Sequence, residues 1–234
     1  MNTLLILGSK PEPILPPRAS YQSIACANAS GFSAAKYGLP TPDYTVISAI
    51  LTSGISSGKQ SLQALSGLKT DVLYFFPRPI KQGNLIRKLI HHIKTIKMSP
   101  FYLKYKLKSI SYEYNQFINK SHTYYDKLIK QLCDNDLQIA QQLEKKQSST
   151  GVIALIIGIT QGRYDRYILS GFSFELTHAY AENPEIDQRG TKVSKHANTD
   201  VAIMNYLSNK YQNIYTTEVT VNERSGIPML QGGR

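Results

Sequence analysis

The stretch Thr3-Leu-Leu-Ile-Leu-Gly-Ser-Lys-Pro11 decides the fold class of this 234-residue chain. Its apolar residues indicate a buried strand, and Gly8-Ser9-Lys10-Pro11 indicates the turn that ends the strand. Similar short apolar runs recur along the chain, with intervals between them that are long enough for helices. They cover residues 23–27, 44–48, 71–76, 166–169 and 214–216. Strands that alternate with crossover segments predict an α/β fold with a mostly parallel sheet flanked by helices.

The composition fits a single domain over residues 1–234. Hydrophobic residues make up 41% of the chain and charged residues 18%, which excludes a disordered or fibrous protein. The longest apolar run, around residues 152–159, is too short to cross a bilayer. Residues 1–8 lack the cationic segment of a signal peptide, so we expect a cytoplasmic protein. The two cysteines, Cys26 and Cys133, cannot build a disulfide framework.

The charge of the chain predicts an anionic partner. The 27 Lys and Arg residues outnumber the 16 Asp and Glu residues, which gives a net charge of +11. From Val72 to Tyr112 there is no acidic residue, and apolar residues at helical spacing over 85–96 predict a basic amphipathic helix. With a second helix expected over 124–146, residues 78–146 form a helical basic insertion. Its role stays open between nucleic-acid binding, peripheral association with an anionic membrane, and plain packing on the sheet.

The last third of the chain returns to the α/β pattern. Residues 150–160 are largely apolar and too long for one strand, so they predict a buried helix. The strand at 166–169 runs into Ser170-Gly171, and the polar segment 174–196 then predicts a mobile lid loop. Asn198-Thr-Asp200 is expected to cap a further helix. His178 and His196 bracket the loop, where a histidine is a candidate general base.

Asp134-Asn-Asp136 allows two interpretations. This spacing can hold a divalent cation against a sugar diphosphate in a metal-dependent nucleotide-sugar transferase. The preceding residues look helical, however, so the motif can equally interrupt one helix and cap the next.

Three pieces of the chain together resemble the bacterial sialyltransferases of glycosyltransferase family 42. The pieces are Ser149-Thr-Gly151, Arg166-Tyr-Ile-Leu-Ser-Gly171 and His196-Ala-Asn-Thr-Asp200. The family has T-S-G, I-Y-L-S-G and H-S-K-N-T-D at these places. Leu4–Gly8 with Pro11, and Cys26-Ala-Asn28, are similar to the family's N-terminal motifs. The resemblance covers about the first 50 residues and the last 85, and leaves out the basic middle.

The resemblance implies a GT-A-like, Rossmann-type enzyme. It would be an inverting, metal-independent glycosyltransferase without a cofactor. Its donor would be a CMP-activated sialic acid or related ulosonic acid, and its acceptor a cell-surface glycan, as in lipopolysaccharide or capsule biosynthesis. An association with further copies of the chain also stays open. The alternatives are a non-catalytic basic protein that binds nucleic acid or membrane, and the metal-dependent transferase built on Asp134 and Asp136.

The resemblance also assigns residues. His196 matches the general base, while Tyr180 and His178 lie where donors to the leaving phosphate are expected. The donor-binding positions are Gly8, Ser9, Asn28, Ser149, Thr150, Gly151, Gly171 and Ser173. Glu175 and Ala181 depart from the family, because they stand where it has two lid tyrosines.

Overall fold

The computed structural model describes residues 1–54, 56–77, 96–178 and 193–231. Within them, seven strands form one sheet in the order β5-β4-β3-β2-β1-β6-β7, and every neighbouring pair is parallel. The strands are β1 (Thr3–Leu7), β2 (Ser23–Ala27), β3 (Tyr44–Ser48), β4 (Lys69–Phe76), β5 (Glu113–Asn119), β6 (Arg166–Ser170) and β7 (Ile214–Thr216). The predicted parallel α/β sheet is confirmed.

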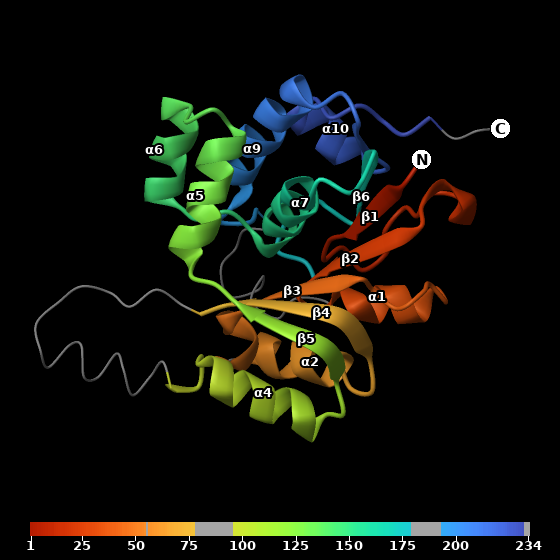
Figure 1. Ribbon diagram of the computed structural model, residues 1–234, viewed down its shortest axis with the longest axis vertical. Helices are drawn as coiled ribbons and strands as arrows, with labels where there is room; N and C mark the ends of the chain where they lie inside the picture. Colours follow the sequence, from red (N-terminus) through yellow and green to blue (C-terminus); the bar gives the residue numbers. More distant parts are fainter. Residues whose placement is uncertain (55, 78–95, 179–192, 232–234) are drawn as a thin grey trace, which may run out of the picture.

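Helices cover both faces of the sheet (Figure 1). On one face lie α5 (His122–Leu132), α6 (Leu137–Lys145), α7 (Thr150–Gln161), α9 (Ala197–Lys210) and α10 (Val219–Ser225). On the other lie α1 (Gly31–Lys36), α2 (Ser56–Ala64) and α4 (Pro100–Ser109). Short 3-10 turns are η1 (Arg18–Ser20), η2 (Asn28–Ser30) and η3 (Ala49–Thr52).

The strand order reverses direction beside β1. The chain steps outward from β1 through β2, β3 and β4 to β5, and then returns to place β6 on the other side of β1. The last residue of β1, Leu7, is therefore in register with Cys26 of β2 and Ser170 of β6. In open parallel sheets, the carboxyl ends of the strands at such a reversal form the crevice in which ligands bind.

Helix α7 forms the centre of the core. All of its residues from Thr150 to Ile159 are buried, because it packs on the sheet and is itself covered by α5. Tyr44 on β3 donates its hydroxyl hydrogen to the Ala154 carbonyl at 2.7 Å, which fixes the helix against the sheet. The helix predicted from this long apolar run is confirmed, although β-branched residues usually favour strands.

The region 78–146 contains a strand as well as helices. Strand β5 pairs with β4 along most of its length, so the expectation of helices alone was wrong. As an edge strand, β5 has no fully buried residue, and its mixed polar sequence lacks the continuous apolar run of the central strands. The basic amphipathic helix predicted over 85–96 falls almost entirely on residues 78–95, outside the described residues.

The single helix expected over 124–146 is two helices. Asp134 and Asn135 adopt positive φ angles of 50° and 58° between α5 and α6. Asp136 then caps α6 by accepting a hydrogen bond from the Ile139 N–H at 3.0 Å. Asp134 lies 2.7 Å from the Lys210 ammonium and accepts a hydrogen bond from Tyr206 at 3.0 Å. The motif thus interrupts and recaps a helix, as the second interpretation predicted.

The start of α9 also differs from the expectation. His196 occupies the N-cap position, and Asn198 to Asp200 lie inside the first turn of the helix. Asp200 does not cap its own helix; its carboxylate accepts a hydrogen bond from the Ser149 N–H across the fold. None of the helices in the described part of the chain is long and apolar enough to span a bilayer.

Candidate active site

The loops after β1 and β6 approach each other so closely that both need glycine. The Gly8 N–H donates to the Ser170 carbonyl at 2.8 Å, and the Lys10 N–H donates to the Gly171 carbonyl at 2.9 Å. A Cβ atom on Gly8 would collide with the carbonyl oxygen of Gly171. Gly171 itself has φ +73°, which favours glycine. Because Gly8 and Gly171 have no side chains, backbone groups form this edge of the crevice.

A buried carboxylate that the sequence analysis missed joins these loops. Glu218 accepts hydrogen bonds from the N–H groups of Gly171 at 2.9 Å and Ile14 at 3.0 Å. It also forms an ion pair with Lys10, with 2.6 Å between Nζ and Oε2. Glu218 comes two residues after the last strand, so its place at the carboxyl edge of the sheet was the available signal.

The N-terminus of α7 forms the opposite wall of the crevice. Ser149 is the N-cap residue, and its own N–H donates to Asp200 at 2.8 Å. Asp200 is 5% exposed, and this burial raises the pKa of its carboxyl to about 7, partly opposed by the hydrogen bonds from Ser149. A Cβ atom on Gly151 would lie 2.6 Å from the Phe172 ring, so glycine is required there as well. The first N–H groups of a helix lack partners inside it and, with the helix dipole, favour anions.

Asn28 connects the two walls. Its amide Nδ2 donates to the Thr150 hydroxyl at 3.1 Å, and its Oδ1 accepts from the Ser48 N–H at 3.2 Å. Its φ of +51° is one that asparagine tolerates better than most residues. The ends of β2, β3 and the start of α7 are therefore held together by one side chain.

All eight predicted donor-binding residues line one cavity of about 90 Å³ at this edge. Ala27, Phe172, Phe174, Glu175, Ser194 and Asp200 line it as well. This volume is below the roughly 300–1,000 Å³ typical of ligand pockets, so a nucleotide needs some of the lining side chains to move. The structure brings the eight residues together, and their role in binding stays a prediction.

His196 lies beside this wall without lining the cavity. Its Nδ1 is 2.7 Å from the Gln147 carbonyl oxygen. A carbonyl only accepts, so Nδ1 carries the hydrogen and Nε2 keeps its lone pair, which is the tautomer a general base needs. Burial lowers the pKa of His196, and the hydrogen bond to Gln147 partly opposes that shift. The imidazole is therefore neutral at pH 7.

A second histidine, His122 at the start of α5, lies near His196. Burial, and to a smaller extent the nearby His196, lowers the pKa of His122 to about 4. Its ring packs edge-on against Phe76 at the end of β4, with 4.5 Å between the centroids. His122 follows directly on the Ser121 cap after β5, so topology and not local pattern brings it to this edge.

The described ends of the predicted lid lie against each other. Glu175 and Val193 form an antiparallel bridge, and the Ser194 N–H donates to the Phe174 carbonyl at 2.9 Å. Thr177, the neighbour of the half-buried His178, has its hydroxyl 3.3 Å from that of Ser9. Tyr180 and Ala181 fall outside the described residues, and the mobility of the loop stays a prediction.

The described residues offer no group of three or more His, Cys, Asp or Glu side chains placed to hold a metal ion. Asp134 and Asp136 do not line the cavity, because their carboxylates serve the ion pair with Lys210 and the cap of α6. A larger cavity, of about 410 Å³, opens between α2 and α4 on the other side of the sheet and contains none of the predicted site residues.

A doubly wound parallel sheet, with glycines and a helix N-terminus at its reversal point, defines an architecture typical of nucleotide-binding proteins. No protein-family model matches the chain, and no curated protein sequence does.

Solved structures identify the fold more closely. The sialyltransferase CstII from Campylobacter jejuni, in complex with the substrate analogue CMP-3FNeuAc, is 15% identical with a TM-score of 0.56, over 99% of this chain and 87% of that one. The α-2,3-sialyltransferase Cst-I from the same organism is 16% identical with a TM-score of 0.55, and the match covers 98% of this chain and 80% of Cst-I. CstII with CMP and a trisaccharide acceptor is 14% identical with a TM-score of 0.55, over 99% and 87%. The chain has the fold of these GT-A-like sialyltransferases, as the resemblance predicted.

Proposed function

We propose that the protein transfers a sialic acid-like sugar from a CMP-activated donor to a glycan acceptor. One observation carries the proposal: the eight residues assigned to donor binding assemble at the reversal point of the sheet, with the general-base candidate His196 beside them. The fold is that of CstII, which has been solved with CMP and with CMP-3FNeuAc. A basic protein that only binds nucleic acid or membrane would not require an imidazole held in this orientation beside the cavity.

The proposed reaction is a single inverting displacement. Nε2 of His196 takes the proton of the acceptor hydroxyl, and the acceptor oxygen forms its bond to the anomeric carbon from the side opposite CMP. The bond between that carbon and the phosphate oxygen breaks, and CMP leaves with the electron pair. N–H groups at Thr150 and Gly151 stabilise the phosphate charge as it develops, a role that other transferases give to a cation. We therefore propose that no metal ion is needed.

A nucleotide panel tests donor binding. CMP at 100 times its dissociation constant stabilises the folded protein by about 2.7 kcal/mol through mass action, which a thermal-shift measurement detects. We expect CMP to raise the melting temperature with or without Mn²⁺, and UMP, UDP and GDP to raise it much less. An equal response to UMP would remove the proposed donor. A response to UDP that depends on Mn²⁺ would favour the metal-dependent alternative.

The change His196→Ala tests the base. We expect sialic acid transfer to oligosaccharide acceptors to fall by about 10²–10⁴-fold, because that is the usual contribution of a general base. The thermal shift with CMP should stay as in the unchanged protein, since His196 does not line the cavity. Undiminished transfer would take the role of base away from His196.

The net charge of +11 supports an acceptor that is anionic or lies beside an anionic surface. We propose a cell-surface glycan precursor, of the lipopolysaccharide or capsule kind, as the acceptor, and a cytoplasmic site of action.

A further inference from the structure

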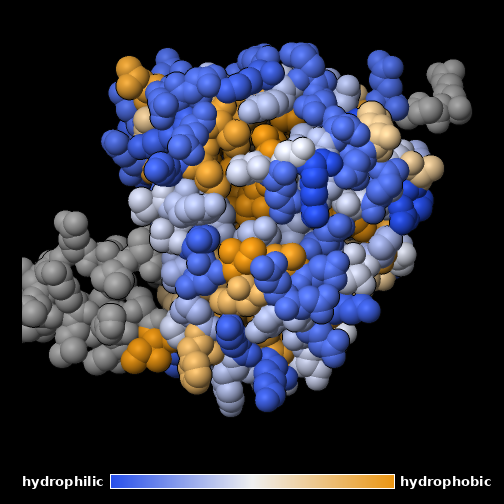
Figure 2. Space-filling view, viewed as in Figure 1, coloured by the Kyte–Doolittle hydropathy of each residue, from blue (hydrophilic) through white to orange (hydrophobic). Residues whose placement is uncertain are grey.

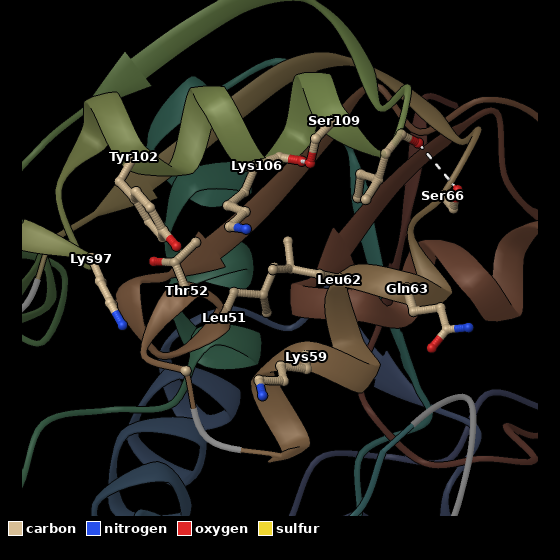
Figure 3. Close-up of a pocket in the computed structure, with 12 residues that line it drawn as sticks. Leu51, Thr52, Lys59, Leu62, Gln63, Ser66, Lys97, Tyr102, Lys106 and Ser109 are labelled. Carbon is tan, nitrogen blue, oxygen red and sulfur yellow. Dashed lines mark hydrogen bonds between the residues drawn. The ribbon is translucent and has the colours of Figure 1, made fainter.

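The face of the molecule that carries α2 and α4 has an unusual charge distribution. The sequence contains no Asp or Glu over residues 44–70 or 72–112, which include η3, α2 and α4. The cavity between α2 and α4 has three lysines among its lining residues, Lys59, Lys97 and Lys106. Leu51, Leu62 and Ile110 supply apolar lining. In Figure 3, Lys106 and Tyr102 point from α4 into this cavity, and Lys59 approaches it from α2.

The outer side of α4 is aromatic. Phe101 is 83% exposed and Tyr105, one turn later, is 60% exposed. Lys104 and Lys108 are exposed on the same side of the helix. Figure 2 shows hydrophobic side chains at the lower edge of the molecule, where the first turn of α4 lies in Figure 1. On the opposite side, Leu103 and Leu107 are completely buried and hold the helix on the sheet.

Further apolar residues border the same surface. Ile50 on η3 is 44% exposed, and Ile96, just before α4, is 58% exposed. Exposed aromatic and aliphatic residues surrounded by lysines are typical of surfaces that lie in a membrane interface, where the rings enter the headgroup region and the cations meet anionic lipids. A nucleic acid would use the lysines and tyrosines but would leave the isoleucines without a partner.

We propose that this face, defined by Ile50, Lys59, Lys97, Phe101, Tyr105 and Lys106, docks on a bilayer of anionic phospholipid. Phe101 and Tyr105 insert between the headgroups, and the three cavity lysines bind headgroup phosphates. Neither Phe101 nor Tyr105 lines the lysine cavity, so the cavity and the exposed rings are two separate features that fit the same occupant.

The docking face connects directly to the proposed donor site. Ser48 at the end of β3 holds Asn28, and the next residues form η3, whose Leu51 and Thr52 line the lysine cavity. Along the sequence, the single 3-10 turn η3 therefore connects the proposed donor site to the lysine cavity. A protein docked through α2 and α4 would present the carboxyl edge of the sheet near the membrane surface, where a lipid-linked acceptor would lie.

Co-sedimentation with vesicles tests the insertion. The full chain should bind phosphatidylcholine vesicles that contain a third of phosphatidylglycerol, and bind pure phosphatidylcholine vesicles at least tenfold more weakly. The double variant Phe101→Ser/Tyr105→Ser should lose about tenfold or more in partition to the anionic vesicles, because two rings no longer enter the interface. Leu137→Ser is the matched control, since Leu137 on α6 is 77% exposed on another part of the surface.

A charge-matched pair of variants tests the lysines. Lys59→Gln/Lys106→Gln should bind the anionic vesicles about tenfold or more weakly. Lys127→Gln/Lys145→Gln removes the same charge from exposed positions on α5 and α6, on the opposite side of the sheet, and should bind as the unchanged chain does. Equal loss in both pairs would overturn the proposal, because net charge alone would then explain binding. So would unchanged vesicle binding of the aromatic variant, or lysine-dependent binding of a homopolymeric RNA without vesicle binding.

The thermal shift with CMP checks that each variant is folded, since no substituted residue lines the donor cavity. Vesicle binding needs no donor, so failure here leaves the proposed transferase function intact.

Discussion

Asp200 is a buried acidic residue whose pKa is strongly raised by its surroundings. Its carboxyl is buried at the point where α9 meets the N-terminus of α7, and it holds the Ser149 N–H. Since burial raises its pKa to about 7, the folded protein keeps this group protonated at pH values where the unfolded chain has ionised it. The residue that accepts the hydrogen bond of the Ser149 N–H at the start of α7 therefore costs stability near neutral pH.

The change Asp200→Asn tests this cost. Well below pH 4 the carboxyl is protonated in both states and contributes no pH dependence. As pH rises from about 4 to about 7, only the unfolded chain loses the proton, so the wild type loses stability on the order of 4 kcal/mol. The variant lacks this loss, and its stability relative to the wild type should rise over that range and stay constant above it.

Urea unfolding at several pH values measures the difference. Glu144→Gln, which removes a carboxyl from the exposed surface, is the control. A difference between Asp200→Asn and the wild type that does not change with pH would contradict a protonated, buried carboxyl.

Gly8 offers a second test at the scale of the residue. Gly8→Ala places a methyl group against the Gly171 carbonyl, and we expect a loss of stability of about 1–3 kcal/mol and a weaker thermal shift with CMP. Gly31→Ala is the matched control, because its Cβ would meet Leu65 at an ordinary 3.6 Å at the start of α1. That variant should equal or exceed the wild type in stability. Similar melting temperatures for both variants would argue against the close approach of the β1 and β6 loops.

Among the elements, α6 allows the acidic motif to be tested directly. Asp136→Ala removes the hydrogen bond to the Ile139 N–H and should lower stability by about 1 kcal/mol, the usual value of an N-cap. Sialic acid transfer should stay unchanged, with or without Mn²⁺, because Asp136 does not line the donor cavity. If transfer fell a hundredfold while stability changed little, the metal-dependent transferase would become the better interpretation.

The elements that could be predicted are those whose local pattern matches their burial. The inner strands β2, β3, β4 and β6 were found because strands covered on both faces read as apolar runs. The edge strand β7 was found because two of its three residues are buried. The glycine and serine residues after them marked the crevice. Strand β5 was missed, since an edge strand needs no such run.

The parts of the site that could not be predicted from the sequence are formed by contacts between distant segments of the chain. Glu218 reaches Gly171 across 47 residues and Ile14 across 204, and no local pattern in the sequence encodes those distances. His122 likewise reaches His196 only through the packing of the fold. The sequence could thus indicate which residues line the cavity at the edge of the sheet, but not the carboxylate and the second imidazole that lie near them.

At the scale of the whole molecule, the helices on the two faces of the sheet differ in burial and in charge. The buried helix α7 and its neighbours hold the crevice in place from one side. The other side carries the acid-free surface of α2 and α4, which we propose meets the membrane. The cavity at the carboxyl edge of the sheet and the cavity between α2 and α4 share no lining residue, so the proposed donor binding and the proposed docking do not compete for the same residues.

The pairing of β1 with β6 also bears on how the protein is made. Leu5 lies beside Ile168, so the first strand to leave the ribosome waits for most of the chain before its central neighbour is synthesised. Loop closure over such a separation is slow, and the exposed edge of β1 is open to wrong pairing in the meantime. We therefore expect the two halves of the crevice to come together late in folding.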